Sequence, residues 1–107
     1  MRRGSVFLVN LEPASPPELG KVRPAVVVSN SVHNERLDSV VVVPLSSQPP
    51  EIWPFRVRVG IPGLKASFAV VPGIRQVHKG RLHELAGYAS REDLRRLDDA
   101  LRVYLGE

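Results

Sequence analysis

The apolar residues of this 107-residue chain occur in short runs that prolines and glycines interrupt, ten and eight of them respectively. Because these two residues mark turns and the ends of regular elements, each run has room for a strand and little more. Several short strands separated by turn signals are typical of a small β-barrel or β-sandwich. We therefore expect a mainly β fold over most of the chain.

Five strands are expected from these runs. In the fourth run, Phe55, Val57 and Val59 alternate with arginines, which indicates a strand buried on one face. The run Val40–Val43 does not alternate, so it is expected to be buried on both faces or to lie at a dimer interface. Segments 12–24, 30–38 and 46–54 are expected to be loops. The five predicted strands are Val6–Leu11, Ala25–Ser29 (begun by Pro24), Ser39–Leu45, Phe55–Val59 and Ser67–Val71.

The C-terminal segment changes to a helical period, with leucines at positions 94, 97, 101 and 105. Ser90 and Asp93 have the spacing of a helix N-cap and its third residue, and Gly106 is expected to end the helix. The sequence thus predicts one domain over residues 1–107, a small bent β-barrel with a C-terminal α-helix of roughly four turns.

Charge and cysteine content narrow the function classes. Lysine and arginine total 15 against 11 acids, a net charge of +4, which is equally compatible with a nucleic-acid-binding protein and with an arginine-rich domain of another kind. The absence of cysteine excludes a disulfide framework, a thiolate metal site and a cysteine nucleophile. The apolar run Val6–Val9 is too short for a signal or membrane segment. We expect a cytoplasmic protein that needs no membrane.

Four stretches, in this order along the chain, resemble the MazF/PemK family of toxins: Arg3–Pro13, Glu18–Asn30, Val41–Ser47 followed by Pro54-Phe55, and Ile74–Leu82. The resemblance implies an SH3-like barrel of the CcdB/MazF/PemK type and a homodimer. It also implies an endoribonuclease that cleaves single-stranded RNA at short motifs, with no metal or cofactor. Its partner would be a MazE-like antitoxin that lays an extended acidic segment over the RNA groove.

The same resemblance assigns three catalytic residues. Arg23 matches the family's catalytic arginine before a proline, and its planar fork suits the two phosphate oxygens on which charge builds. Ser46 matches the hydroxyl residue after the third strand, although its neighbour Ser47 is an alternative. Glu18 matches a functional glutamate that orients Arg23 or accepts the 2′-OH proton. The structural alternatives are an arginine that pins its loop, a serine that bonds its own backbone, and a solvated loop acid.

RNA-binding roles are assigned to a further set of residues. The cluster Arg75, His78, Lys79 and Arg81 could contact phosphates, although charged runs are more often simply solvated. Trp53 could stack a base, although a lone tryptophan more often packs in the core or under a loop. The chain departs from the family pattern at Ser5, at Pro72-Gly73 and at His78, and the change at Pro72-Gly73 is expected to alter backbone geometry and RNA preference.

Two other functions use the same fold. One is a non-catalytic RNA-binding regulator, and the other is a CcdB-like inhibitor of a protein target. The arginine-proline pair at Arg23-Pro24 favours the ribonuclease, because it is the part of the sequence that resembles the catalytic members.

Overall fold

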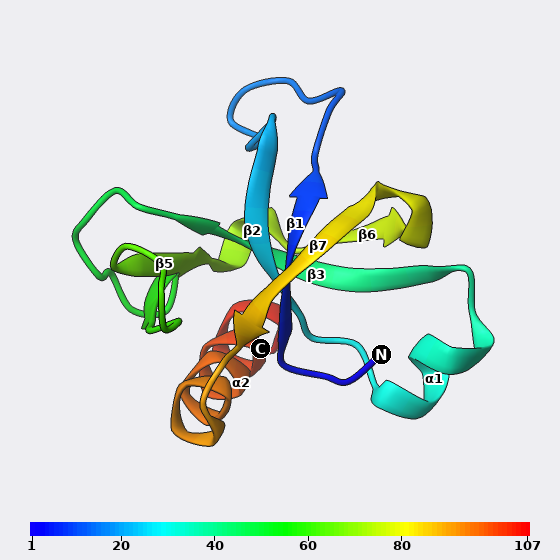
Figure 1. Cartoon of the computed structure of the whole chain (residues 1–107). Coiled ribbons are helices and arrows are strands. Elements are labelled where there is room, and N and C mark those ends of the chain that lie inside the picture. Colours follow the sequence, from blue (N-terminus) through cyan, green and yellow to red (C-terminus); the bar gives the residue numbers. More distant parts are fainter.

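The computed structural model, which describes residues 1–107, arranges the strands of the chain in one antiparallel sheet (Figure 1). The strands follow the order β4-β5-β3-β2-β1-β7, and β6 pairs with β3 outside this path. The seven strands are β1 (Ser5–Asn10), β2 (Val22–Val27), β3 (Ser39–Ser46), β4 (Arg56–Val59), β5 (Ser67–Val70), β6 (Arg75–His78) and β7 (Leu82–Tyr88).

Strand β3 is the centre of the sheet, since it pairs with β2, β5 and β6. Its alternating side chains enter two different hydrophobic clusters, with Val40 and Val42 in one and Val43 and Leu45 in the other. All four are essentially buried. Burial on both faces, the first of the two alternatives for this valine run, is therefore confirmed, and it explains the lack of alternation.

Helix α2 (Arg91–Leu105) covers the larger cluster with Leu97, Ala100 and Leu101. The Ser90 hydroxyl oxygen accepts a hydrogen bond from the Asp93 backbone N–H at 3.1 Å, so the expected N-cap is confirmed. The Asp93 carboxylate accepts in turn from the Gly60 N–H at 2.9 Å, which ties the start of the helix to the end of β4. No helix in the structure is long and apolar enough to cross a membrane.

The expected fold class, a mainly β fold with a C-terminal helix, is confirmed. The sheet is not closed by hydrogen bonds, because its edge strands β4 and β7 do not pair. The chain just after β4 nevertheless reaches β7: Ile61 Cγ2 lies 2.9 Å from where a Cβ on Gly87 would be. Gly87 also has φ +154°, which favours glycine. A side chain fills the gap, so the sheet curls into an open barrel.

Two strands were not expected, and one begins earlier than expected. Strands β6 and β7 lie in a stretch whose exposed polar residues hide any alternation, and β7 joins β1 through register shifts at two points. Strand β2 starts at Val22 inside the expected loop, so Pro24 lies within a strand. Pro24 pairs only with Leu8 of β1, and a proline is tolerated where one side of the strand is unpaired.

The expected loop 30–38 contains a short helix, α1 (Ser31–Arg36), which corrects the sequence-based expectation. The Asn30 side chain caps it by accepting from the backbone N–H groups of Val32 and His33, at 2.8 and 3.3 Å. Six residues are too few to show a helical period in the sequence. Asn30 as a possible N-cap was the sequence signal for this helix, and it was missed.

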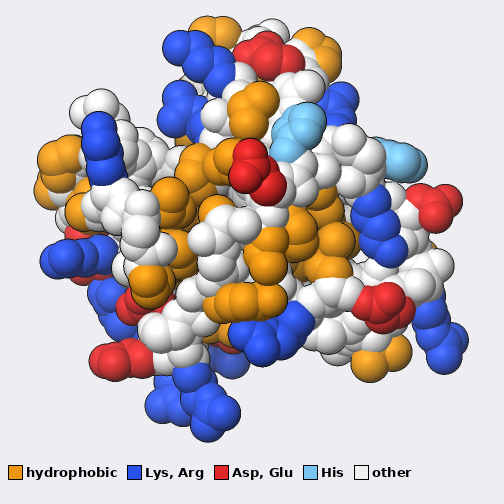
Figure 2. Space-filling view, in the orientation of Figure 1, with side chains coloured by type: hydrophobic (Ala, Val, Ile, Leu, Met, Phe, Trp, Pro, Cys, Tyr) orange, Lys and Arg blue, Asp and Glu red, His pale blue; other side chains and the backbone are white.

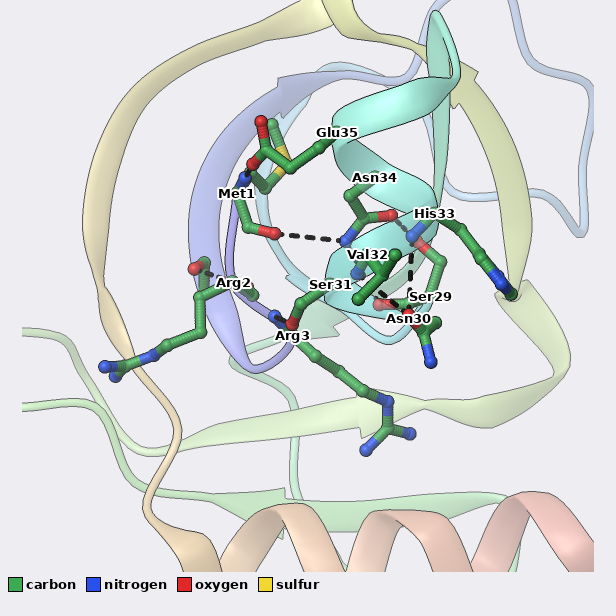
Figure 3. A network of polar contacts seen from close by, with 11 residues as sticks. Met1, Arg2, Arg3, Ser29, Asn30, Ser31, Val32, His33, Asn34 and Glu35 are labelled. Carbon is green, nitrogen blue, oxygen red and sulfur yellow. Dashed lines mark hydrogen bonds and ion pairs between the residues drawn. The ribbon is translucent and has the colours of Figure 1, made fainter.

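Polar contacts hold α1 to the N-terminus (Figure 3). Asn34 is 1% exposed; it donates to the carbonyls of Met1 and Ser29 and accepts from the Ser29 hydroxyl at 2.6 Å. The Ser29 hydroxyl oxygen accepts from the Val41 N–H at 3.0 Å. The Met1 ammonium pairs with Glu35. These contacts, here called the N-terminal network, join α1, the end of β2 and β3.

Candidate active site

A pocket of about 380 Å³ opens where β2 and β5 begin and β3 ends. Its lining contains three cationic side chains and three hydroxyl groups but no carboxylate. Such a lining suits a phosphate group, which needs positive charge and hydrogen-bond donors. The lining residues are Lys21, Val22, Arg23, Pro24, Leu45, Ser46, Ser47, Leu64, Lys65 and Ser67.

The strand register brings Arg23 and Ser46 together. Ala25 of β2 pairs with Pro44 of β3 in antiparallel register. Arg23 and Ser46 lie two residues beyond this pair on their strands, and both line the pocket. The ladder between the strands ends at the Ala25–Pro44 pair, and the pocket opens beyond it.

Arg23 is half-buried, and only part of its guanidinium is engaged. Its Nε donates to the Gly20 carbonyl at 2.9 Å, which is the loop-pinning role that the sequence left open. The two terminal nitrogens make no hydrogen bond or ion pair within the chain. The same residue therefore holds its loop and still offers a two-pronged donor to the pocket.

Ser46 is buried, with 6% of the residue exposed, whereas Ser47 is exposed. Ser46 Oγ accepts from the Gln48 backbone N–H at 3.1 Å, so it does bond its own loop. Its hydroxyl hydrogen has no acceptor in the chain. This geometry favours Ser46 over Ser47 as the positioned donor.

Lys21 and Lys65 belong to the pocket and were missed by the sequence reasoning. Lys21 lies just before β2 and two residues before Arg23, so it carried no strand-period signal of its own. Its backbone has φ 66°, uncommon for a residue with a side chain, and its N–H donates to the Glu12 carboxylate at 2.6 Å. Lys65 carried no local signal, because only the pairing of β3 with β5 brings it near.

Glu18 is not brought into contact with Arg23. Its carboxylate accepts from the Ser15 N–H at 2.8 Å within its own loop. It lines a second pocket of about 420 Å³ together with Arg75 and Pro44. Pro44 precedes Leu45 of the first pocket on β3, so the two pockets lie next to each other along that strand.

The four residues of the predicted basic cluster divide into two groups by position. Arg75 donates to the Leu11 carbonyl at 3.1 Å, and Arg81 donates to the carbonyls of Asn10 and Glu12, so both brace the loop after β1. His78 and Lys79 lie at the other end of β3: His78 pairs with Ser39, seven residues before Ser46, or roughly 23 Å away. His78 Nδ1 also accepts from the Gly80 N–H at 2.9 Å, which caps the 3-10 helix η2 (Lys79–Arg81).

Pro72 and Gly73, where the chain departs from the family pattern, lie in the other 3-10 helix, η1 (Val71–Gly73). The proline is in its first turn. Ser5 is buried, and its hydroxyl donates to the Arg2 carbonyl at 2.6 Å. This contact gives Ser5 a structural role near the N-terminus, away from the pocket.

Trp53 lies in loop 47–55, between β3 and β4, and is 48% exposed, so it is not a core residue. The loop is tied to the body of the protein through Glu51. Hydrogen bonds from the Arg58 backbone N–H and the Arg96 guanidinium, both at 2.8 Å, lower the pKa of Glu51 below its ordinary value. The loop that follows Ser46 therefore has a fixed anchor on β4 and α2.

Lysine and arginine side chains surround the face seen in Figure 2, while hydrophobic side chains gather towards its centre. Acidic side chains also occur on this face, and the net charge of +4 favours binding of a polyanion. No group of three or more His, Asp or Glu side chains in the structure is placed to hold a metal ion.

A model of the PemK-like, MazF-like toxins of type II toxin–antitoxin systems matches residues 2–105. The endoribonuclease MazF9 of Mycobacterium tuberculosis is 37% identical over 113 residues, which cover 98% of this chain and 96% of the relative. The crystal structure of MazF from Deinococcus radiodurans is similar in fold, with a TM-score of 0.86 and 23% identity, over 100% of this chain and 97% of that one. A mycobacterial endoribonuclease in complex with its cognate antitoxin gives a TM-score of 0.80 at 24% identity, over 98% and 94% of the two chains. The chain therefore belongs to the PemK-like, MazF-like toxins of type II toxin–antitoxin systems.

Proposed function

We propose that this toxin cleaves single-stranded RNA in the pocket between β2, β3 and β5, by attack of a ribose 2′-OH on the adjacent phosphate. One observation carries the proposal: Arg23 and Ser46 line the same pocket, and both keep free hydrogen-bond donors in its cationic, acid-free lining. The resulting bond cleavage would leave a 2′,3′-cyclic phosphate and a 5′-hydroxyl. These residues need no metal for that reaction, which requires only proton transfer and stabilisation of charge.

Arg23 is assigned to the phosphate. As the 2′-oxygen attacks, negative charge builds on the two non-bridging oxygens, and the terminal nitrogens of Arg23 can donate to both. Its Nε bond to Gly20 fixes the fork before substrate arrives, so little reorganisation accompanies the reaction. Lys21 and Lys65 add charge at the same pocket.

Ser46 is assigned to the phosphate and its leaving group, and Glu18 is assigned to the attacking 2′-OH. The Ser46 hydroxyl donates to the scissile phosphate or to the departing 5′-oxygen, since its hydrogen has no other acceptor. Glu18 is assigned the 2′-OH proton, because its pocket adjoins the first along β3 and only one hydrogen bond to its carboxylate is present. Ser47, which is exposed at the rim, would contact RNA and not the reacting atoms.

The rest of the RNA is proposed to follow the basic surface past Arg75 towards His78, Lys79 and Arg81, with Trp53 available to stack a base. We further propose that residues 1–107 act as one domain, because both hydrophobic clusters are built on the same sheet. The protein would act in the cytoplasm as a homodimer. A cognate antitoxin of the MazE kind, with an extended acidic segment, would neutralise the cationic pocket.

The test incubates the purified protein with long single-stranded RNA in excess chelator, beside Arg23→Ala and Glu18→Gln, and maps the fragment ends. We expect discrete cuts with cyclic phosphate and 5′-hydroxyl ends, about 100- to 1,000-fold slower in Arg23→Ala, as for loss of one donor to a transition-state oxyanion. Glu12→Gln, which removes an acid from the same loop, is the control for Glu18→Gln.

Three results would count against the proposal. Intact RNA with tight binding would point to a non-catalytic RNA-binding regulator, and intact RNA without binding would point to an inhibitor of a protein target. Full activity of Arg23→Ala would remove the residue on which the assignment rests.

A further inference from the structure

We propose that Arg56 is a positioning residue for this reaction: it orients the Ser46 hydroxyl through the backbone of loop 47–55. This inference rests on the proposed role of Ser46. Arg56 belongs to β4 and does not line the catalytic pocket, so nothing in the mechanism above uses it. Two successive hydrogen bonds, both to the backbone of Gln48, nevertheless connect it to Ser46.

The first step joins Ser46 to Gln48. The Gln48 backbone N–H donates to Ser46 Oγ at 3.1 Å. A serine hydroxyl has one hydrogen to donate and two lone pairs that accept. With one lone pair directed at Gln48, rotation of the hydroxyl is restricted, and its hydrogen is turned away from the Gln48 N–H. The position of the Gln48 peptide thus decides where Ser46 can donate.

The second step joins Gln48 to Arg56. One guanidinium donates from Nη2 to the Gln48 carbonyl and from Nε to the Pro50 carbonyl, the latter at 3.4 Å. Because the guanidinium is planar and rigid, two bonds from it fix the orientation of this stretch of backbone better than two independent donors would. No carboxylate forms an ion pair with Arg56, and both hydrogen bonds of its side chain go to carbonyls of the loop.

Arg56 is itself held by a residue of the strand that pairs with Ser46. Its guanidinium carbon lies 5.9 Å from the ring centroid of Phe68, within the range of a cation–π contact. Phe68 on β5 is the residue that pairs with Ser46 on β3. The contacts therefore run in a closed path from Ser46 to Phe68, then to Arg56, and back to Ser46 through Gln48.

The far part of the loop has its own anchor, since Glu51 is bound by the Arg58 N–H and by Arg96 of α2. Loss of the Arg56 side chain should accordingly loosen residues 47–50 while the rest of the loop stays in place. We expect a change in the rate of the chemical step and little change in folding or in RNA affinity.

A double-mutant cycle tests the inference, with kcat and KM measured for the wild type, Arg56→Ala, Ser46→Ala and the double variant on one short RNA. We expect Ser46→Ala to lower kcat about 100-fold. Arg56→Ala should lower kcat about 10-fold with KM unchanged, since a small misplacement is costly in a catalytic site. In the Ser46→Ala background the Arg56 change should have no further effect. Arg56→Lys, which keeps the charge and a single donor nitrogen, should recover part of the loss.

Arg58→Ala is the matched control, because it removes the same charge from the same strand at an exposed position. It should leave kcat unchanged. If Arg56→Ala does not give a folded circular dichroism spectrum, the cycle is run with Arg56→Gln, which retains amide donors.

The possible results separate the two proposals. If Arg56→Ala slows the reaction equally in both backgrounds, or raises KM and lowers the salt dependence of RNA binding, Arg56 acts on the RNA itself and the positioning role is wrong. A normal kcat for Arg56→Ala overturns the positioning role alone. A normal kcat for Ser46→Ala overturns both the assignment of Ser46 and the inference built on it.

Discussion

Arg3 and Arg23 show how the same side chain is used in two regions of this protein. The Arg3 guanidinium donates from Nε to the Val28 carbonyl at 2.7 Å and from both terminal nitrogens to the Asp98 carboxylate. Arg23 has a single bond, from Nε to Gly20. In Arg3 all three guanidinium nitrogens are bonded within the protein, whereas Arg23 keeps its two terminal nitrogens for a ligand.

The contrast extends to the surroundings of the two residues. Around Arg3, the N-terminal network pairs the buried amide of Asn34 and the hydroxyl of Ser29 with protein partners (Figure 3). Around Arg23, cations and a serine O–H point to a pocket without any acid. Polar groups that stabilise a fold are paired within it, whereas polar groups that act on a substrate must stay available. The following changes test that division, from the largest expected effect to the smallest.

Replacing each arginine with lysine should separate catalysis from stability. In Arg23→Lys the fork is lost, so we expect kcat/KM to fall about 100-fold with no change in melting temperature. In Arg3→Lys the paired contact to Asp98 is lost, so we expect the free energy of unfolding to fall by about 1–2 kcal/mol with activity unchanged. Kinetics on a fluorogenic RNA and thermal unfolding of both variants are the measurements. A folded Arg3→Lys protein that has lost activity would contradict the division.

Two asparagines compare a buried residue of the N-terminal network with the exposed N-cap of the same helix, α1. Asn34→Ala leaves the carbonyls of Met1 and Ser29 without their donor, so we expect a loss of about 2 kcal/mol. Asn30→Ala removes only the N-cap of α1, at about 1 kcal/mol. Urea unfolding checks both values. If the two losses were reversed in size, the N-terminal network would not be the main restraint on α1.

Glu51 should give the smallest effect, and one that depends on pH. Because the Arg58 N–H and Arg96 hold the pKa of Glu51 below 4.5, its carboxylate stabilises the folded protein above that pH. The contribution is lost as the pH falls through the lowered pKa. We expect Glu51→Gln to cost at most about 1 kcal/mol near neutral pH, since the contact is exposed. Urea unfolding of both proteins at neutral and acid pH checks this, and a difference that persisted below the lowered pKa would exclude the ion pair as its cause.

The sequence predicted well where the signal is local. The period of Leu94, Leu97 and Leu101, with Ser90 as cap, was enough to predict α2, because a helix is made from contacts a few residues apart. The central strand was predicted almost to the residue from its valine run. Strand β7 could not be recognised, because its pairing with β1 joins distant segments and its own residues are mostly exposed.

The candidate site shows the same limit. The resemblance picked out Arg23, Ser46 and Glu18, but only the first two share a pocket in the structure. The sequence contained the residue types and their order. It did not contain the register of β2 against β3, which sets the distance between side chains more than twenty residues apart.

The sequence by itself determined the mainly β class, the closing helix, the positive charge and the toxin family, since all of these depend on composition, short-range period and motif order. Only the tertiary structure decided which cations face the same pocket, why the terminal nitrogens of Arg3 are paired while those of Arg23 are free, and how Arg56 reaches Ser46 through a loop. Those facts depend on strand pairing and loop contacts between distant residues, where small differences in geometry decide whether a polar group is satisfied or left free to act.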